Sequence, residues 1–527
     1  MREKISPSFF LNISGKTDRA SQNVLTTLES CAGLHGRAWA TLFLFLKDRT
    51  MFDSILNRID DVVWGIPTIV LILMTGIILT IRTRGLQFAQ LGRAFKSIFK
   101  ENKGAGELSG FSALCTALSA TIGTGNIVGV ATAIAAGGPG ALFWMWFAAI
   151  LGTATKYAEC MLAIKYREVK EDGHVLGGPF YTIEKGLGPK WKWLAVLFAV
   201  FGVLAGLLGI GTMTQINGIT SAVKLAFDAN SETVAFVING TAYSKPTVIS
   251  GIVVTVSSAL VIIGGLKRIS KVAEKIVPAM AFIYIFLGVS VIVMNATRIP
   301  AAFALIFNSA FGFKAVAGGA FGWTLKQVTD SMQKGIARGI FSNEAGLGSA
   351  PIAAAPVQTE EPVEQGLVNM TGTVIDTLIV CTMTGLAIVL SLADPEFFAQ
   401  YEQNGWKGVE LTAHALSFSL GGDGISVQFL LMVCLTFFAF TTILGWNYYS
   451  EKCLEYLANG KMKYVFIFRL VYIFAIAIGP YFTVNSVFTI ADITNGLMAI
   501  PNCISLILLS GIVAKETKTY FNKYPTL

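Results

Sequence analysis

The chain has 527 residues, of which 54% are hydrophobic and only 14% are charged. A soluble protein of this length carries about a quarter charged residues, so the composition excludes an ordinary soluble globular protein and indicates a polytopic membrane protein. The net charge of +8 does not indicate nucleic-acid binding, because most basic residues stand in short loops between apolar spans. Seven cysteines without a CxxC pair and three scattered histidines predict neither a disulfide framework nor a metal site.

Apolar stretches of about 20 residues can cross a bilayer as helices, and they predict eleven spans, so the fold class is all-α. The first is Val62–Ile81, which has no charged residue. Two more lie within Leu108–Ile164, with Gly137–Gly140 as the turn between them. The others, in chain order, are Leu194–Phe227, Thr247–Leu266, Ile276–Ala296, Thr324–Ala355, Gly366–Leu392, Val427–Tyr448, Tyr464–Gly479 and Ser486–Val513.

Loop charge predicts the orientation of these spans. The loop after the first span holds Arg82, Arg84, Arg93, Lys96, Lys100 and Lys103. Such a loop is typical of the cytoplasmic side, and the next turn, Gly137–Gly140, has no basic residue. The predicted inner loop Thr359–Gln365 is acidic instead, but acidic residues contribute little to orientation. We therefore expect an external amino terminus and a cytoplasmic tail at 516–527, in a bacterial-type inner membrane.

Residues 1–50 do not fit this arrangement. They contain seven Lys or Arg residues that would have to cross the membrane, and only one short apolar run, "AWATLFLFL". They also lack a clear signal-peptide cleavage site. Either the chain starts at Met1, or Met51 is the physiological start and 1–50 is an extension that is not part of the mature chain. We favour Met51, with a membrane-spanning domain at 51–515.

A glycine-rich motif stands in the charge-free second span. It reads "SATIGTGNIVGVATAIAAGG" and covers residues 119 to 138. A dinucleotide-binding turn is excluded, because the spacing of Gly123, Gly125 and Gly129 is one residue too long and the next acidic residue is Glu159. Two glycines, two threonines and an asparagine within six residues would weaken a helix, and broken backbone at membrane depth survives only against protein or an aqueous cavity. The motif predicts a broken helix that forms a binding site.

A second motif of this kind stands in the other half of the chain. It reads "RGIFSNEAGLGSAPIAAAP" and covers Arg338 to Pro356. Transporters with such a pair of breaks direct half-helix amino termini at anionic groups and freed carbonyls at cations. Each break lies in the first of five spans, which predicts two repeats at about 110–296 and 324–513 after the first helix. A re-entrant or packing segment is the alternative for the second stretch.

Hydroxyl and amide side chains occur in other spans. Thr441 and Thr442 either bond back to their own helix or supply oxygen ligands to a hard cation. Gln215 and Asn217 either face the same cavity or tie helices together.

Ionisable side chains also stand within apolar spans. Burying a charge in the membrane costs free energy, so each of these residues is a candidate for a functional role. Lys156 and Glu159 share a helix face and are expected to pair, unless they act in gating or coupling. Asp376 has the same two alternatives, a structural ion pair or a coupling role. Arg338 and Glu344 flank the second break and are expected to pair across it when a gate closes.

The sequence resembles the alanine or glycine:cation symporter family. The resemblance runs from about Met51 to Val513. It is carried by the stretches "SATIGTGNIVGVATAIAAGGPGALFWMW", "GGPFYTIEKGLG" and "GIARGIFSNEAGLGSAPIAAA". It implies the inverted-repeat fold of bacterial leucine transporters with one additional amino-terminal helix, and sodium-driven uptake of L- or D-alanine or glycine.

The resemblance also implies roles for particular residues. The implied substrate-binding residues are Thr121, Gly123, Thr124, Gly125, Asn126, Gln215, Phe341, Ser342, Asn343 and Trp446. The implied sodium ligands are Ser119, Ile122, Phe438, Thr441 and Thr442. In this scheme the amides of Thr124 and Gly125 bind the substrate carboxylate, and carbonyls of the second break bind its ammonium group.

The expected function is therefore sodium-coupled symport of a small neutral amino acid by alternating access, without a cofactor and without enzymatic activity. A proton-coupled permease, in which Asp376 or Glu159 is essential, is the first alternative. A channel is the second, and it would show conductance without saturable, coupled uptake. A membrane-embedded enzyme would need a nucleophile or metal constellation within the spans, and the sequence offers none.

Overall fold

The computed structural model describes residues 49–100, 104, 106–171, 174–238, 241–312, 321–422 and 424–525. The chain divides into two compact units, Met1–Ile59 and Asp60–Leu527. In the first unit the described residues belong to α4 (Arg49–Val63). The predictions about residues 1–48 lie outside the described residues.

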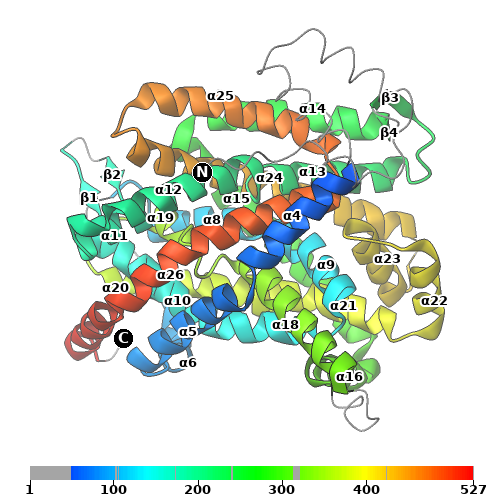
Figure 1. Ribbon diagram of the computed structural model, residues 1–527, viewed down its shortest axis with the longest axis horizontal. Helices are drawn as coiled ribbons and strands as arrows, with labels where there is room; N and C mark the ends of the chain where they lie inside the picture. The colour runs from blue at the N-terminus through cyan, green and yellow to red at the C-terminus, as the bar shows by residue number, and fades with distance from the viewer. Residues whose placement is uncertain are drawn as a thin grey trace, which may run out of the picture. The chain divides into compact units, whose positions relative to one another are not determined.

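The second unit is built from helices, shown in Figure 1. They are α5 (Ile66–Arg82), α6 (Leu86–Ala89), α7 (Leu91–Ser97), α8 (Gly110–Thr121), α9 (Val128–Gly137), α10 (Ala141–Tyr166), α11 (Pro179–Gly186), α12 (Lys192–Leu208), α13 (Met213–Phe227), α14 (Lys245–Ile262), α15 (Gly265–Met294), α16 (Ile299–Phe311), α18 (Phe321–Asn343), α19 (Ala350–Ala354), α20 (Pro362–Thr373), α21 (Thr382–Leu392), α22 (Pro395–Asn404), α23 (Val409–Leu420), α24 (Gly424–Leu457), α25 (Met462–Ile478) and α26 (Val484–Lys523). Between α20 and α21 the backbone is π-helical over Val374–Cys381. Short 3₁₀ turns cover Thr124–Asn126, Pro189–Trp191, Ala296–Arg298 and Gly479–Tyr481.

Two small antiparallel hairpins complete the described structure. Strands β1 (Glu168–Val169) and β2 (Val175–Leu176) pair through Glu168 with Leu176 and Val169 with Val175. Strands β3 (Val234–Ile238) and β4 (Thr241–Ser244) pair from Val234 with Ser244 to Ile238 with Thr241.

Nine stretches of the described chain are long and apolar enough to cross a membrane. They are Ser54–Arg82, Ala141–Tyr166, Pro189–Phe227, Lys245–Ile262, Gly265–Met294, Pro362–Leu392, Ser426–Leu457, Met462–Tyr481 and Val484–Lys523. The two other predicted spans are the ones predicted to be broken. The first consists of the short apolar helices α8 and α9, and the second of α18 and the five-residue α19.

The second unit exposes many large apolar side chains and buries polar ones beside its apolar core. Large apolar side chains point outward, and Phe282, Phe286 and Leu260 are each more than 60% exposed. Polar side chains are instead buried, among them Asn126 and Ser342 at 0% exposure. An apolar exterior is what a lipid bilayer requires, so the chain is a multi-pass membrane protein.

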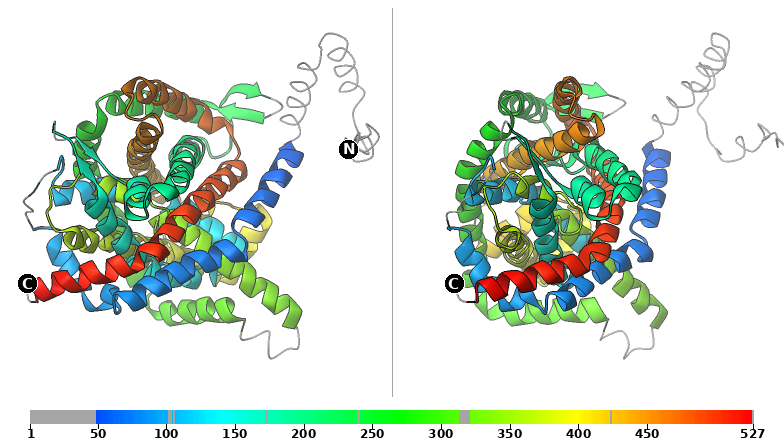
Figure 2. Two further views of the ribbon diagram at one scale, coloured as in Figure 1. Left: turned by 60° about the vertical axis from the view of Figure 1, so that its left-hand side comes forward. Right: turned by 90° about the vertical axis from the view of Figure 1, so that its left-hand side faces the viewer.

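Small residues allow the helices to pack closely. A Cβ atom on Gly152 of α10 would lie 2.8 Å from the Ala345 Cβ, and one on Gly335 of α18 would lie 2.3 Å from the Ala141 carbonyl oxygen. Helix α10 thus contacts both α18 and α20, while α26 runs beside α5 (Figures 1 and 2). The second break is therefore surrounded by other helices.

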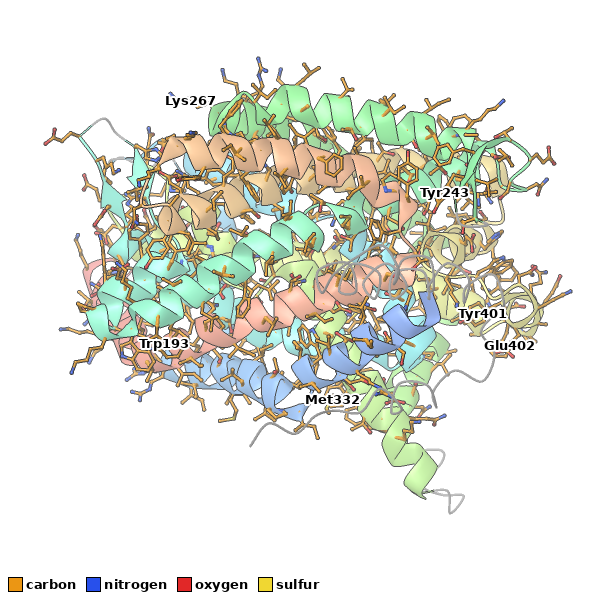
Figure 3. The ribbon with its side chains drawn as sticks, turned by 45° about the horizontal axis from the view of Figure 1, so that its top comes forward. Trp193, Tyr243, Lys267, Met332, Tyr401 and Glu402 are labelled. Atoms are coloured by element: carbon orange, nitrogen blue, oxygen red, sulfur yellow. The ribbon has the colours of Figure 1, made fainter. Side chains whose placement is uncertain are left out.

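The loops lie at two opposite ends of the helices. Figure 3 shows Trp193 and Lys267 at one end and Tyr243, Tyr401 and Glu402 at the other. These are the ends that loop charge predicts to be cytoplasmic and external, respectively.

The predicted span Leu194–Phe227 lies within the apolar stretch Pro189–Phe227, and the structure adds a break at Gly209–Thr212 that divides it into α12 and α13. Helix α26 continues into the predicted tail as far as Lys523. The Thr517 hydroxyl lies 2.7 Å from the Tyr157 hydroxyl, so tertiary contacts extend this helix beyond its apolar stretch.

Candidate functional site

The first break confirms that the glycine motif interrupts a helix. Helix α8 ends at Thr121, whose hydroxyl donates back to the Ala117 carbonyl at 2.7 Å. At Ile122 the backbone becomes extended, and the Gly123 amide donates to the Asn126 Oδ1 at 2.9 Å. The Thr124 amide donates to the Gln215 Oε1 at 3.0 Å. Backbone groups that a continuous helix would pair internally are thus bound by side chains.

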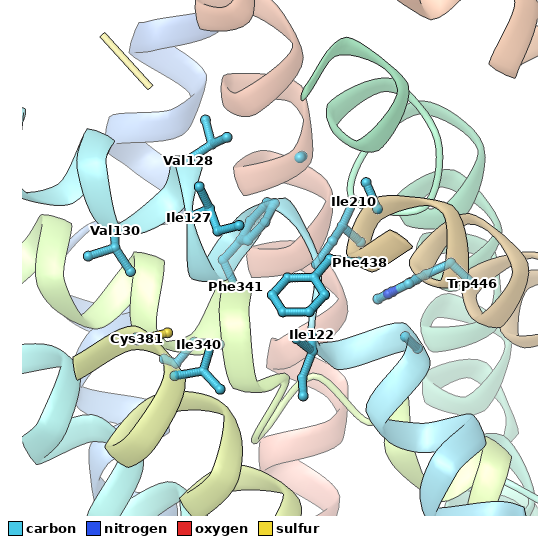
Figure 4. Packing of buried hydrophobic residues seen from close by; sticks show 14 of the residues in the cluster. Ile122, Ile127, Val128, Val130, Ile210, Ile340, Phe341, Cys381, Phe438 and Trp446 are labelled. Atoms are coloured by element: carbon cyan, nitrogen blue, oxygen red, sulfur yellow. The ribbon is translucent and has the colours of Figure 1, made fainter. Parts of the chain in front are cut away.

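The second break lies against the first. A Cβ atom on Gly125 would lie only 3.1 Å from both the Phe341 ring and the Ser342 Cα, so a larger residue here would have to push the second break away by a few tenths of an ångström. Figure 4 shows Phe341, Phe438 and Trp446 among the buried side chains around the breaks.

Helix α18 ends at Asn343, and Glu344 then adopts a left-handed backbone with φ of 58°. This conformation is strained for a residue with a side chain, and strain of this kind clusters at functional sites. The Glu344 carboxylate is held by the Trp446 indole nitrogen at 2.6 Å and by the Ser349 hydroxyl at 2.7 Å. Its side chain therefore turns toward α24 and away from Arg338.

A third break, between α12 and α13, is connected to the first break by hydrogen bonds of Gln215. The Gln215 amide nitrogen donates to the Ile210 carbonyl inside this break at 2.8 Å, while its oxygen binds Thr124. The Tyr472 hydroxyl lies 2.9 Å from the Gly211 carbonyl oxygen. Sequence reasoning missed this break, although the predicted span was too long for one membrane crossing and contained "GIGT".

Oxygen atoms from α8 and α24 converge on the hydroxyl of Thr442. Its Oγ1 lies 3.0 Å from the carbonyl oxygens of Ser119 and Phe438 and 3.2 Å from that of Ile122. The Thr441 Oγ1 lies 3.0 Å from the same Phe438 carbonyl oxygen. The structure therefore brings the five predicted sodium ligands together.

These oxygens suit a hard cation. A hydroxyl has one proton, so Thr442 can donate to only one of the three carbonyls around it. Ser119 and Ile122 stand at the carboxyl end of α8, where no following turn supplies amides and the helix dipole is negative. Hard cations prefer carbonyl and hydroxyl oxygens of this kind.

Asp376 connects the two breaks. Its Oδ1 accepts from the Asn126 amide at 2.6 Å, and its Oδ2 accepts from the hydroxyls of Ser342 at 2.9 Å and Thr377 at 2.7 Å. Asp376 lies in the π-helical stretch, and such stretches are frequent at functional sites. The structure therefore places Asp376 at the site, although the implied set of ligands did not include it.

Two expected ion pairs were wrong. The Lys156 ammonium donates to the Asn343 carbonyl at 2.6 Å, while Glu159 accepts from the Gly346 amide at 3.0 Å and the Asn502 amide at 2.5 Å. No ion pair among the described residues joins Lys156 to Glu159, because the backbone of the second break binds both side chains.

The expected partner of Arg338 was the second error. Arg338 does not bind Glu344; its Nη1 lies 2.7 Å from the Asp492 carboxylate. Asp492 lies on α26, and the left-handed backbone at Glu344 turns that carboxylate toward Trp446 instead.

The family model described as the sodium:alanine symporter family matches residues 49–526. The chain belongs to this family. Its members are transporters, and the resemblance found in the sequence is thereby confirmed.

Curated relatives cover nearly all of the chain. An uncharacterized transporter of Haemophilus influenzae is 48% identical over 89% of this chain and 96% of its own. The sodium/alanine symporter AgcS of Methanococcus maripaludis is 44% identical over 89% of this chain and 97% of its own. A probable sodium/glutamine symporter, GlnT, of Bacillus subtilis is 37% identical over 89% of this chain and 91% of its own.

A solved structure shows the fold. The crystal structure of MhsT in complex with L-phenylalanine matches with a TM-score of 0.52 and 13% identity, over 79% of this chain and 99% of that chain. At this identity the likeness shows the fold alone, which is the leucine-transporter-like fold that the sequence predicted.

In this member of the family, an aromatic and ionic layer covers the breaks toward the predicted external end. The rings of Phe341 and Phe488 are 5.5 Å apart, and the Arg338 guanidinium lies 5.0 Å from the Phe488 ring centre while it binds Asp492.

A cavity of about 230 Å³ lies at this layer. It is lined by Val128, Phe488, Asn217, Lys224 and Glu410, among others. Asn217 has the tying role of its two predicted alternatives, since its amide donates to the Phe482 carbonyl at 2.8 Å; the cavity that it lines contains none of the predicted substrate or sodium ligands.

A set of polar contacts joins the segments at the predicted cytoplasmic end. The Arg167 guanidinium donates to the carbonyls of Ala355, Val357 and Thr359 at 2.5 to 2.8 Å. Partial burial lowers the pKa of Arg167 below its ordinary value, but an arginine remains charged in proteins. The segment after the second break is thus anchored to the end of α10.

His174 makes a second contact of this kind. Its ring lies 3.4 Å from the Glu107 carboxylate, which precedes α8, and 3.0 Å from the Glu455 carboxylate on α24. The β1–β2 hairpin is thereby held against segments that lead to the site.

Proposed function

We propose that this protein is a sodium-coupled symporter of a small neutral amino acid, alanine or glycine, that works by alternating access. The observation that carries the proposal is the meeting of the two breaks beside the oxygen cluster around Thr442. The inner-membrane location, the external amino terminus and the cytoplasmic carboxyl terminus form part of the same proposal.

The chemistry of a zwitterion fits the two breaks. In a low-dielectric interior each charge of an amino acid needs a partner, because an unpaired charge is costly. The Gly125 amide lies in the 3₁₀ turn that precedes α9 and can donate to a carboxylate, whereas the Thr124 amide would first have to leave the Gln215 oxygen that it binds at 3.0 Å. Carbonyls at the end of α18 can accept from an ammonium group.

The size of the substrate follows from the packing around the first break. A Cβ atom on Gly123 would lie 2.5 Å from the Thr442 hydroxyl oxygen, and Gly125 touches Phe341. The backbone and one aromatic ring thus leave little room for a long side chain, which favours alanine and glycine over larger amino acids.

The oxygen cluster explains coupling to sodium. Its carbonyls belong to α8, whose end forms the first break, and its hydroxyls belong to α24. A sodium ion bound there would fix the position of the break that binds the substrate carboxylate. Thermodynamic linkage makes the effect mutual, so substrate would also strengthen sodium binding.

Alternating access needs closures at both ends of the site. The Arg338–Asp492 pair with the Phe341–Phe488 ring contact is positioned to close the external end. The Arg167 and His174 contacts are positioned to close the cytoplasmic end. Rocking of one repeat against the other would open these layers in turn.

Uptake of labelled L-alanine into proteoliposomes tests the proposal. We expect accumulation with an inward sodium gradient, none when potassium replaces sodium, and competition by excess glycine. Uptake driven by a pH step and indifferent to sodium would instead establish the proton-coupled alternative, and conductance without saturable uptake would establish a channel.

A further inference from the structure

Asp376 is a buried carboxylate to which the proposed transport cycle gives no role. It is 0% exposed, and none of the ion pairs within 4.0 Å that the described residues form involves it. Three hydrogen-bond donors surround it, which is the environment of an ionised carboxylate. A neutral asparagine would connect the same helices without the cost of burying a charge, so the charge itself calls for a function.

The position of Asp376 is that of a substrate ligand. Its three donors come from the first break (Asn126), from the second break (Ser342) and from its own helix (Thr377). An ionised carboxylate offers about four acceptor positions, and these donors occupy three of them. One position is left for a further donor beside the site proposed for the amino acid.

The carbonyls of the second break are less available than the sequence implied. The Asn343 carbonyl accepts from the Lys156 ammonium at 2.6 Å, and the Ile340 carbonyl accepts from the Glu344 amide at 2.8 Å. An ammonium group at the end of α18 therefore meets fewer carbonyl oxygens than a free helix end would offer. An anionic oxygen next to Ser342 would supply the partner that is needed.

The geometry favours an ammonium group over a metal ion at this carboxylate. The Asn126 side chain turns its amide nitrogen toward Asp376, and this orientation is fixed because its oxygen accepts from the Gly123 amide at 2.9 Å. A metal site would present oxygen atoms here, as the cluster around Thr442 does.

We propose that Asp376 is the anionic partner of the substrate's ammonium group and selects amino acids over hydroxy acids. The inference rests on the proposed function and deepens it. The ammonium group of the substrate would bind the Asp376 side chain in the π-helical stretch. The carboxylate group of the substrate would bind the backbone of the first break, as proposed above.

Ligand binding to the purified full-length protein tests this role. Affinities for L-alanine and for L-lactate, which carries a hydroxyl in place of the ammonium group, are measured by calorimetry in sodium chloride. The proteins are the wild type, Asp376→Asn and Glu159→Gln. Glu159 is a matched control, because it is also a buried carboxylate that accepts from an asparagine amide, and its backbone partner, the Gly346 amide, is not among the groups proposed to bind the substrate.

We expect Asp376→Asn to weaken alanine binding by about 10- to 100-fold, the loss expected on removal of a charged hydrogen-bond partner. The alanine-to-lactate affinity ratio should fall by a similar factor in this variant and stay at the wild-type value in Glu159→Gln. Sodium should still raise the melting temperature of Asp376→Asn, because the cluster around Thr442 is intact. If Asp376→Asn does not fold, Asp376→Ser is also neutral and smaller, and the same ratio is expected to fall.

An unchanged ratio in the neutral variant would overturn the inference, and so would an equal fall in Glu159→Gln. A change in the number of sodium ions bound per alanine, with the ratio unchanged, would overturn it in favour of a cation site. A wild-type protein that does not bind alanine in sodium would overturn the proposed function as well, so the two failures are distinguishable.

Discussion

The Asn126 side-chain amide lies 2.6 Å from the Asp376 carboxylate, and the Ser342 hydroxyl lies 2.9 Å from the same group. One carboxylate therefore holds the 3₁₀ turn of the first break and the last turn of α18, where the second break begins. Helix α21 adds a further contact, because the Thr384 hydroxyl donates to the Asn126 carbonyl at 2.7 Å. A movement of one break is thus transmitted to the other through the helix that carries Asp376.

The need for glycine at position 123 can be tested within one motif. In Gly123→Ala the new Cβ would lie 2.5 Å from the Thr442 hydroxyl oxygen and 2.9 Å from the Gln215 oxygen. We expect sodium-dependent alanine uptake to fall by about 5- to 150-fold, since such overpacking costs about 1–3 kcal/mol. Gly129→Ala is the control, because the atom nearest to its Cβ is 3.9 Å away. Equal uptake by the two variants in proteoliposomes would contradict the account.

The external closure predicts coupling between Arg338 and Asp492. Both side chains are largely buried and lie 2.7 Å apart. Arg338→Gln or Asp492→Asn alone leaves the other charge buried without its partner, so each should lower the free energy of unfolding by about 3–5 kcal/mol. The free energy of unfolding of the double variant should fall by less than the sum of the two single losses, and the difference is a coupling energy of about 1–3 kcal/mol. Unfolding in mixed micelles measures this, and additive losses would show that the pair does not act as a unit.

The cytoplasmic closure depends on the planar guanidinium of Arg167. A lysine has no fork of donors and cannot reach the carbonyls of Ala355, Val357 and Thr359 together. Arg167→Lys should therefore raise amide hydrogen exchange in residues 355–359 by about tenfold or more. The matched control is Lys165→Gln, which breaks a half-exposed ion pair with Glu516 that contributes little. Unchanged exchange in Arg167→Lys would exclude this anchoring role.

Both broken helices could be predicted from the sequence, because the residues that indicate each break lie within a single short stretch. Glycine, threonine and asparagine within a charge-free span conflict with a continuous helix, and this conflict is visible without any tertiary information. The break between α12 and α13 carries the same kind of signal in "GIGT". It was missed because the 34 residues of Leu194–Phe227 were counted as one span.

The partners of the ionisable residues depend on tertiary structure. Helical spacing places Lys156 and Glu159 on one face, but the second break offers backbone groups that compete for both side chains. Likewise, Arg338 binds a carboxylate 154 positions further along the chain. The sequence showed that Asp376 places an ionisable side chain in an apolar span, which made it a candidate for a structural or a coupling role. Its role in joining both breaks depends on packing and on a π-helical stretch that the sequence did not predict.

The most direct test of the central claim is the sodium dependence of alanine binding when Thr442 is altered. The alanine dissociation constant is measured at low and at saturating sodium in the wild type, in Thr442→Val and in Thr116→Val. The Thr116 hydroxyl is a control because it donates to the Ser112 carbonyl of its own helix. The account predicts that sodium tightens alanine binding in the wild type and in Thr116→Val, by about 5- to 150-fold, and that Thr442→Val loses most of this effect. An equal sodium effect in Thr442→Val, or none in the wild type, would contradict it.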